Sequence, residues 1–205
     1  MTMTFPPRPP IETNGVPPAL FAHVVLQTAR VDEMKDWYCT VLSAHVVHEG
    51  HGLCFLTYDD EHHRIAFLSS PGLERADREW AGVHHVAYSF AELGQLLSTY
   101  RHLKAKGILP SRSINHGPTT SLYYRDPDGN RVEMQVDNFS SKEEAARYFY
   151  SDEFERNPVG VQFDPENLIR DYEAGVPLVD LLRRPPLPPG ATLGDMRTER
   201  QGDGR

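Results

Sequence analysis

The sequence predicts an α+β protein that consists of two tandem βαβββ modules and a C-terminal extension. The main reason is that one order of strand-like and helix-like patterns occurs twice, with a repeat of about 60 residues. The two copies also agree in register, since residues 21–24 align with 83–86 and residues 64–67 align with 131–134. In addition, Pro, Gly and charged residues become frequent towards the end of the chain, which separates an extension from the repeated part.

The first copy begins with a strand-like run at 20–27, which has the length and β-branched content of a strand. A helix is expected at 31–43, because apolar residues recur there at the spacing of one helical face. These residues are Val31, Met34, Trp37, Tyr38, Val41 and Leu42. Three short strands are then expected at 45–49, 53–59 and 63–69.

The second copy repeats this order after a polar break. A strand is expected at 83–88, and a helix at 91–106 is predicted by apolar spacing and by Gly107, a typical residue after a helix end. Three further strands are expected at 111–116, 119–125 and 131–136.

We therefore expect a Pro-rich arm at 1–18, a folded domain at 19–138 and an extension at 139–205. Module one is assigned to 19–70 and module two to 82–138.

The extension is predicted to be helical first and extended or disordered afterwards. A helix is expected at 141–150, with Ser140 or Ser141 as its N-cap, and another at 165–174, which begins with a proline. From Pro185 onward the Pro-, Gly- and charge-rich composition favours an extended or disordered tail.

Composition limits the classes of partner. The net charge of −8 and the absence of a Lys/Arg-rich block argue against nucleic acid and anionic membranes as partners. Cys39 and Cys54 lack metal-ligand spacing and are interpreted as free thiols of a reducing compartment. There is no signal-peptide pattern and no apolar run of about 18 residues, so a cytoplasmic protein is expected.

One carboxylate stands out within the segment 114–133. Glu133 lies in a predicted strand between apolar neighbours, directly after the turn signal at 126–130. A carboxylate on a half-buried strand needs a partner, since burying an unpaired charge costs several kcal/mol. An arginine such as Arg64 or Arg131, other hydrogen-bond donors or a metal ion could each meet that need.

Two tandem βαβββ units resemble the vicinal oxygen chelate fold of glyoxalases, bleomycin-resistance proteins and extradiol dioxygenases. The resemblance covers residues 20–137 and implies a cup-shaped mixed sheet with a metal inside, held by the first and last strands of each module. Those positions carry His23, His85 and Glu133, and Ala66 occupies the fourth. Two histidines and one carboxylate form the facial triad of non-haem Fe(II) oxygen chemistry. Each histidine taken alone also fits an ordinary core or surface position, and His84 competes with His85 for the inward face.

The segment 114–133 resembles the signature of type I extradiol ring-cleavage dioxygenases, which combines a histidine, a tyrosine, an Asp-Pro-x-Gly turn and a glutamate. The match places His116 and Tyr123 beside the substrate and Glu133 on the metal. The run 61–66 resembles the strand that carries the acid–base histidine of that family, at His63.

The resemblance implies Fe(II)-dependent extradiol (meta) cleavage of a catechol by O2, to a semialdehyde-type product, with Mn(II) as a possible substitute metal. The remaining alternatives are a glyoxalase-like isomerase or epimerase with another metal, and a metal-free protein that sequesters a small molecule. The extended arms at both ends suggest a homo-oligomer, with a dimer favoured.

Overall fold

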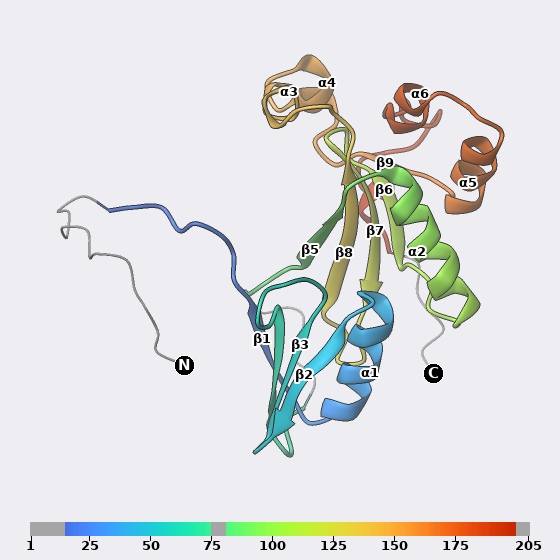
Figure 1. Cartoon of the computed structure of the whole chain (residues 1–205). Helices are drawn as coiled ribbons and strands as arrows, with labels where there is room; N and C mark the ends of the chain where they lie inside the picture. Colours follow the sequence, from blue (N-terminus) through green and yellow to red (C-terminus); the bar gives the residue numbers. More distant parts are fainter. Residues whose placement is uncertain (1–14, 75–80, 200–205) are drawn as a thin grey trace.

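The computed structural model describes residues 15–74 and 81–199, so most of the predicted N-terminal arm at 1–18 lies outside the described residues. The described chain is an α+β protein with two separate mixed sheets, and this confirms the predicted fold class (Figure 1). The first sheet, called sheet one, has the strand order β1-β4-β3-β2. The second, called sheet two, has the order β5-β8-β7-β6-β9.

Module one has the predicted order of elements. They are β1 (Val24–Thr28), α1 (Val31–Val41), β2 (His45–Gly50), β3 (Leu53–Thr57) and β4 (Ile65–Ser69). Strand β1 pairs in parallel with β4, which requires a crossover that includes α1.

Module two repeats the arrangement, and its last two strands are longer than those of module one. Its elements are β5 (Val86–Phe90), α2 (Leu93–Ala105), β6 (Arg112–Asn115), β7 (Thr119–Arg125) and β8 (Arg131–Asp137). The parallel pair β5–β8 places Ala87 opposite Glu133, as β1–β4 places Val25 opposite Ala66. The internal repeat inferred from the sequence is therefore a repeat of register as well as of element order.

The first strand of each module starts later than predicted. Strand β1 begins at Val24 because its partner β4 begins at Ile65, and no strand of the described part of the chain pairs with residues 20–23. The guanidinium of Arg64 instead donates hydrogen bonds to the carbonyl oxygens of Phe21 and Ala22. His23 and His85 consequently lie directly before their strands, at equivalent places in the two modules.

The two sheets are covered differently. In sheet one, the face that contains Leu56, Ile65 and Phe67 packs on α1. In sheet two, one face packs on α2, and the opposite face contributes Ile114 and Tyr123 to a cluster with Val159, Val161 and Met196 of the extension. Sheet two is therefore covered on both faces, in part by the C-terminal extension.

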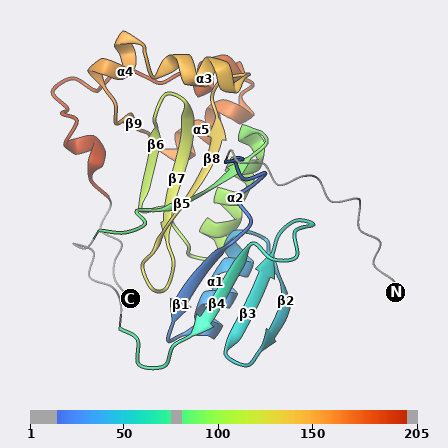
Figure 2. The ribbon, with the colours of Figure 1, turned by 90° about the vertical axis from the view of Figure 1, so that its left-hand side faces the viewer.

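The modules are joined through α1 and the turn between β7 and β8. The hydroxyl of Tyr38 donates a buried hydrogen bond of 3.2 Å to Asp126, and Arg30 forms an ion pair of 3.1 Å with Asp128. Val132 of β8 packs in the core of module one, and Val41 of α1 packs in the core of module two. Figures 1 and 2 show sheet one below sheet two, with α1 and α2 on the same side of the molecule.

The extension contains the elements α3 (Lys142–Tyr148), α4 (Asp152–Arg156), β9 (Val161–Gln162), α5 (Pro165–Glu173), α6 (Leu178–Leu182) and the short helix η1 (Asp195–Arg197). Helices α3 and α5 were predicted, and Ser141 is the N-cap of α3, its hydroxyl accepting from the amide of Glu144. The helices α4 and α6 were not predicted because each is only five residues long. Among the described helices, none is long and apolar enough to cross a membrane.

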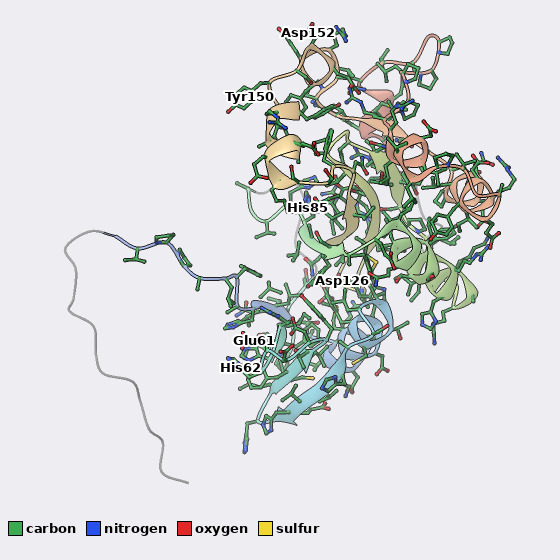
Figure 3. The ribbon with its side chains drawn as sticks, turned by 45° about the horizontal axis from the view of Figure 1, so that its top comes forward. Glu61, His62, His85, Asp126, Tyr150 and Asp152 are labelled. Carbon is green, nitrogen blue, oxygen red and sulfur yellow. The ribbon has the colours of Figure 1, made fainter. Side chains whose placement is uncertain are left out.

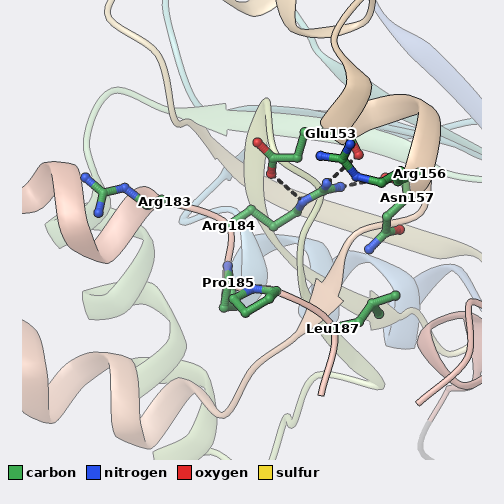
Figure 4. A pocket seen from close by; sticks show the side chains of 8 residues that line it. Glu153, Arg156, Asn157, Arg183, Arg184, Pro185 and Leu187 are labelled. Atoms are coloured by element: carbon green, nitrogen blue, oxygen red, sulfur yellow. Dashed lines mark hydrogen bonds and ion pairs between the residues drawn. The ribbon is translucent and has the colours of Figure 1, made fainter. Parts of the chain in front are cut away.

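Arg184 connects separate segments of the extension. Its guanidinium pairs with Glu153 at 3.0 Å and donates to the carbonyl oxygens of Glu153 and Asn157. These groups line a pocket of about 520 Å³ (Figure 4). None of the six residues singled out in the sequence lines this pocket, so it belongs to the structure of the extension.

Candidate active site

A histidine–carboxylate pair lies on sheet two. Nε2 of His85 is 2.9 Å from Oε2 of Glu133, whose side chain is almost fully buried. Strand alternation places Glu133 and its partner Ala87 on one face, and His85, two residues before Ala87, points to that same face. Nδ1 of His84 lies 2.7 Å from Nδ1 of His85, and this contact turns Nε2 of His85 towards Glu133. The structure thus distinguishes His85 from its neighbour.

A tyrosine and a second histidine flank this pair. Tyr123 lies opposite Glu133 in the β7–β8 register, and its hydroxyl is 2.9 Å from Nε2 of His116. Nε2 of His116 is 4.0 Å from Oε1 of Glu133. Nδ1 of His116 lies 2.6 Å from the carbonyl oxygen of Val159, to which it must donate. A neutral His116 therefore accepts a hydrogen bond from Tyr123 at Nε2.

Burial is the main cause of the pKa shifts of His116 and Tyr123. Burial lowers the pKa of His116, against the raising effect of the Val159 carbonyl and the Glu133 carboxylate. Burial, followed by the negative charge of Glu133, raises the pKa of Tyr123 well above its ordinary value. Both effects keep His116 neutral and Tyr123 protonated at neutral pH, so the tyrosine is a hydrogen-bond donor.

Arg112 was not among the site residues predicted from the sequence. Its guanidinium lies over the ring of Tyr123, 5.5 Å from the ring centre, and its Nε is buried without a hydrogen-bond partner among the described residues. Burial lowers the pKa of Arg112, and the neighbouring Tyr123, Glu199 and Glu133 counteract this. Since a buried N–H without a partner is costly, this donor is available to a ligand.

The other two predicted residues lie together on sheet one. The rings of His23 and His63 are 4.3 Å apart, and His63 stacks on Phe55 with a ring distance of 4.8 Å. Nδ1 of His62 lies 2.6 Å from Nδ1 of His63. Burial, together with His23 and His62, lowers the pKa of His63. Ala66, which pairs with Phe55 across the strands, is buried and offers no ligand atom.

The six residues thus form two groups, one per sheet. We name His85, Glu133, Tyr123 and His116 the carboxylate half-site, and His23 with His63 the imidazole half-site. Figure 3 shows His85 beside the upper sheet and His62 beside the lower one. Among the described residues, no three His, Cys, Asp or Glu side chains lie together in a way that could hold a metal ion.

The fit of a metal ion can be tested on these distances. Two adjacent ligands of an octahedral ion, each at about 2.1 Å, are roughly 3 Å apart, and the His85–Glu133 distance of 2.9 Å matches this. The third expected donor, His23, belongs to the other half-site. His85 and Glu133 are therefore close enough to bind one metal ion, and the third predicted ligand of the same chain, His23, is not beside them.

The repeated βαβββ fold, with a buried histidine–carboxylate pair on its second sheet, defines the class of this α+β protein. This chain belongs to the Glyoxalase/Bleomycin resistance protein/Dioxygenase superfamily, whose family model matches residues 20–134. This confirms the superfamily resemblance inferred from the sequence.

Two relatives share most of this chain. Biphenyl-2,3-diol 1,2-dioxygenase 2 of Rhodococcus globerulus is 58% identical over 159 residues, which are 77% of this chain and 84% of that protein. Biphenyl-2,3-diol 1,2-dioxygenase 3 of the same organism is 47% identical over 165 residues, 80% of this chain and 87% of that protein. Both are dioxygenases, and this agrees with the enzyme class predicted from the sequence.

A solved structure supports the fold. The glyoxylase/bleomycin resistance protein/dioxygenase domain from Frankia sp. EAN1pec is 18% identical and has a TM-score of 0.50. The similarity covers 59% of this chain and 99% of that one. At this identity the comparison concerns the fold alone.

The carbonyl that orients His116 comes from the extension, at a turn that lies close to β6. The Val159 carbonyl reaches His116 because the chain turns at Gly160, whose φ is +114°. A Cβ on Gly160 would lie 2.5 Å from the carbonyl oxygen of Asn115, so this close approach requires glycine. The Asn-Pro-Val-Gly run was visible in the sequence, but its contact with His116 spans 43 residues.

Proposed function

We propose that this protein is an Fe(II)-dependent extradiol dioxygenase that opens a catechol ring beside its two hydroxyl groups, with O2 as co-substrate and a semialdehyde-type product. The observation that carries the proposal is the buried His85–Glu133 pair flanked by Tyr123 and His116. The two biphenyl-2,3-diol dioxygenases similar to this chain support an aromatic diol as the substrate.

We assign the metal to His23, His85 and Glu133, with Mn(II) as a possible substitute. Two imidazoles and one carboxylate suit a divalent iron ion and leave positions for substrate and O2. Iron, when bound, lowers the pKa of a coordinated hydroxyl and allows electrons to pass from the ring to O2. Glu133 is buried and has His85 at 2.9 Å, which is a suitable setting for a carboxylate that meets a cation.

His63 is assigned the proton transfers. An imidazole can accept a proton from a catechol hydroxyl and later return it. Phe55 stacks on one side of the His63 ring and His62 contacts its Nδ1, so Nε2 is the nitrogen left for the substrate. The adjacent ring of His23 places this group next to a proposed metal ligand.

Tyr123 and His116 are assigned to hydrogen bonding with substrate oxygen atoms. Tyr123 is held protonated by burial and by Glu133, and a buried O–H donor stabilises negative charge that develops on oxygen. His116 is oriented by the Val159 carbonyl and accepts the Tyr123 hydroxyl at Nε2, so a hydrogen bond from either group to a substrate oxygen requires the His116–Tyr123 bond to open. Arg112 supplies a positive charge over the Tyr123 ring.

The test is an anaerobic reconstitution. The protein is loaded with Fe(II), then mixed with a panel of catechols that includes biphenyl-2,3-diol, and O2 is admitted. We expect the absorbance of a ring-opened product to rise as one O2 is consumed per catechol. Absence of that product from every catechol in the panel, with iron bound, would refute the proposed function.

We further propose a cytoplasmic, homodimeric protein. Cys39 and Cys54 are both free thiols, which fits a reducing compartment. Cell fractionation and light scattering of the purified protein test these two statements.

A further inference from the structure

We infer that Glu199 is a specificity-determining residue that restricts this enzyme to catechols whose ring substituent carries no negative charge. Its carboxylate pairs with Arg125 and Arg131 beside the carboxylate half-site, where an anionic substituent would otherwise bind. The inference rests on the proposed function for the reaction, and it adds a restriction on the substrate that one residue of the extension imposes.

The two arginines lie on the same face of sheet two as the carboxylate half-site. The β7–β8 register pairs Arg125 with Arg131, and two residues further along it pairs Tyr123 with Glu133. Side chains two residues apart on a strand point to one face and are about 7 Å apart, because a strand rises about 3.3 Å per residue. Both guanidinium groups are therefore within reach of a substituent on a ring that contacts Tyr123.

The carboxylate of Glu199 binds both guanidinium groups. Nε of Arg131 donates to its Oε1 at 2.5 Å, and Nη2 of Arg125 donates to its Oε2. The Glu199 side chain is only 18% exposed, so this is not an ordinary surface ion pair. Burial alone would raise the pKa of Glu199, but Arg131 and Arg125 hold it below the ordinary value. A charged carboxylate of the chain thus lies where the two guanidinium groups meet.

A third arginine adds positive charge at this place. Arg112 lies over the ring of Tyr123. Burial lowers the pKa of Arg112, the charge of Glu199 counteracts this and the charge of Arg131 adds to it, so the three groups lie near one another. Partly buried cations without a partner are costly, and an anion that meets them forms strong, charge-assisted hydrogen bonds. The face would therefore favour an anionic ligand if Glu199 did not occupy it.

The segment that carries Glu199 is held on this face by other contacts as well. Met196 packs in the cluster that contains Tyr123. The side-chain amide of Gln162 donates to three carbonyl oxygens within residues 195–198, directly before Glu199. The position of Glu199 therefore does not depend on its two ion pairs alone.

This arrangement treats charged and uncharged substituents differently. An uncharged substituent leaves both ion pairs of Glu199 in place. A carboxylate substituent meets two arginines that are already paired and a negative charge beside them, and like charges held close together in a partly buried site repel strongly. Removing the charge of Glu199 should turn the same place into a binding site for that carboxylate.

The experiment compares Glu199→Gln with the wild type on two catechols that differ in charge. One carries a propanoate side chain next to a hydroxyl group, and the other is its methyl ester. Glutamine keeps the size of the glutamate side chain and removes its charge. We expect the ratio of kcat/KM for the acid over the ester to rise about 10- to 100-fold, as for a gained hydrogen-bonded charge pair.

A second measurement does not depend on turnover. Calorimetry on the iron-loaded protein under nitrogen gives the Kd of each catechol, because no ring is opened without O2. The affinity for the acid relative to the ester should rise by the same factor in Glu199→Gln. Adding Arg125→Met to this variant should abolish most of the gain, since one of the two guanidinium groups is then lost.

Two controls separate charge from a loosened segment. Gln162→Ala removes the three hydrogen bonds to residues 195–198 without changing any charge, so acid and ester should be affected alike. Glu173→Gln removes a carboxylate that pairs with Arg101 on the surface, and it should leave the ratio unchanged. Circular dichroism verifies that each variant folds.

The outcomes distinguish the inference from the proposed function. An acid-to-ester ratio that stays unchanged in Glu199→Gln, in either measurement, overturns the inference. An equal rise of that ratio in Gln162→Ala overturns it too, because the charge of Glu199 is then not the cause. A rise of the binding ratio in a protein that cleaves neither these nor any other catechol supports the inference about Glu199 and refutes the proposed function.

Discussion

Sheet one and sheet two derive from the same βαβββ pattern, yet they bury their inner faces differently. Sheet two packs on α2 and, with Ile114 and Tyr123, also on the C-terminal extension. Among the described residues, the face of sheet one that points away from α1 has no such cover, and Val25 is half exposed there. The comparison teaches that an extension appended to one module can support a buried polar site in that module alone.

The two modules also differ at one equivalent strand position, which is Ala66 in module one and Glu133 in module two. Both residues lie opposite the second residue of the parallel partner strand, and both are nearly inaccessible, at 2% and 4% exposure. A carboxylate is tolerated at that depth in module two because His85, His116 and Tyr123 surround it. In module one a small apolar residue leaves room for the Phe55–His63 stack. We interpret module two as supplying the carboxylate ligand and one histidine, and module one as supplying the second histidine ligand and the proton-transfer histidine.

The largest effect is expected from Glu133→Gln. Losing the carboxylate removes the group that pairs with His85, so iron retention should fail and activity should fall on the order of 10⁴-fold, as for a member of an interdependent catalytic set. Metal analysis of the purified protein and O2 uptake measure the two effects. The control is Gln135→Ala, two residues along the same face, where the side chain only donates to Ser89. Equal losses in both variants would contradict a specific role for Glu133.

His63→Phe should show that proton transfer can be lost while metal binding is retained. A phenyl ring preserves the stacking on Phe55 but cannot transfer a proton, so turnover should fall about 10²- to 10⁴-fold with iron content unchanged. His62→Phe should have a much smaller effect, because His62 is exposed and contacts the site through His63. Unchanged turnover in His63→Phe would remove this residue from proton transfer.

Tyr123→Phe should reduce kcat by roughly 10²-fold, which is the usual loss when one oriented donor to a developing oxyanion is removed. Tyr124→Phe is a matched control, since Tyr124 lies on the opposite face and its hydroxyl is buried without a hydrogen-bond partner. Its removal should leave kcat unchanged. A similar kcat loss in both variants would indicate a general effect on β7.

Arg112→Met should weaken substrate binding more than turnover. The guanidinium has a buried, unsatisfied Nε beside Tyr123, so its loss should raise KM for a catechol about tenfold, with a smaller change in kcat. Arg101→Met, whose surface guanidinium pairs with Glu173, is the control. A lower kcat at constant KM would instead place Arg112 in the chemical step.

The smallest effect is expected at the junction of the modules. Tyr38→Phe removes a hydrogen bond to Asp126, whose pKa is raised by burial and partly brought back down by Asn130 and Tyr38. Because the folded-state pKa of Asp126 is raised, its contribution to stability is lost as the pH increases through that pKa. Without Tyr38 the pKa rises further, so the variant should lose about 1–3 kcal/mol of unfolding free energy at pH 7.

At a pH where Asp126 is protonated with or without Tyr38, the loss should be smaller. Urea unfolding at both pH values measures the difference, and Tyr58→Phe at the same junction, where the ring packs edge-on against Tyr88, is the control. A loss that does not depend on pH would show that Tyr38 acts through packing alone.

Much of the fold could be predicted from the sequence because the relevant interactions are local or repeated. The α1 and α2 spacing, the Ser141 N-cap and the register shared by Ala66 and Glu133 are properties of short segments. The choice of His85 over His84 also followed from its equivalence with His23. The side-chain contact between His85 and Glu133 is then a consequence of parallel pairing between β5 and β8.

Other features depend on contacts between distant residues. The carbonyl of Val159 that orients His116 comes from the extension, and the Tyr38–Asp126 bond spans 88 residues. Neither has a local pattern that predicts it. By itself, the sequence determined which residue types occupy the equivalent strand positions, because alternation and repetition are encoded locally. Only the tertiary structure decided that His23 and Glu133 lie in separate half-sites, because the packing of α1 against the β7–β8 turn fixes how the modules face each other.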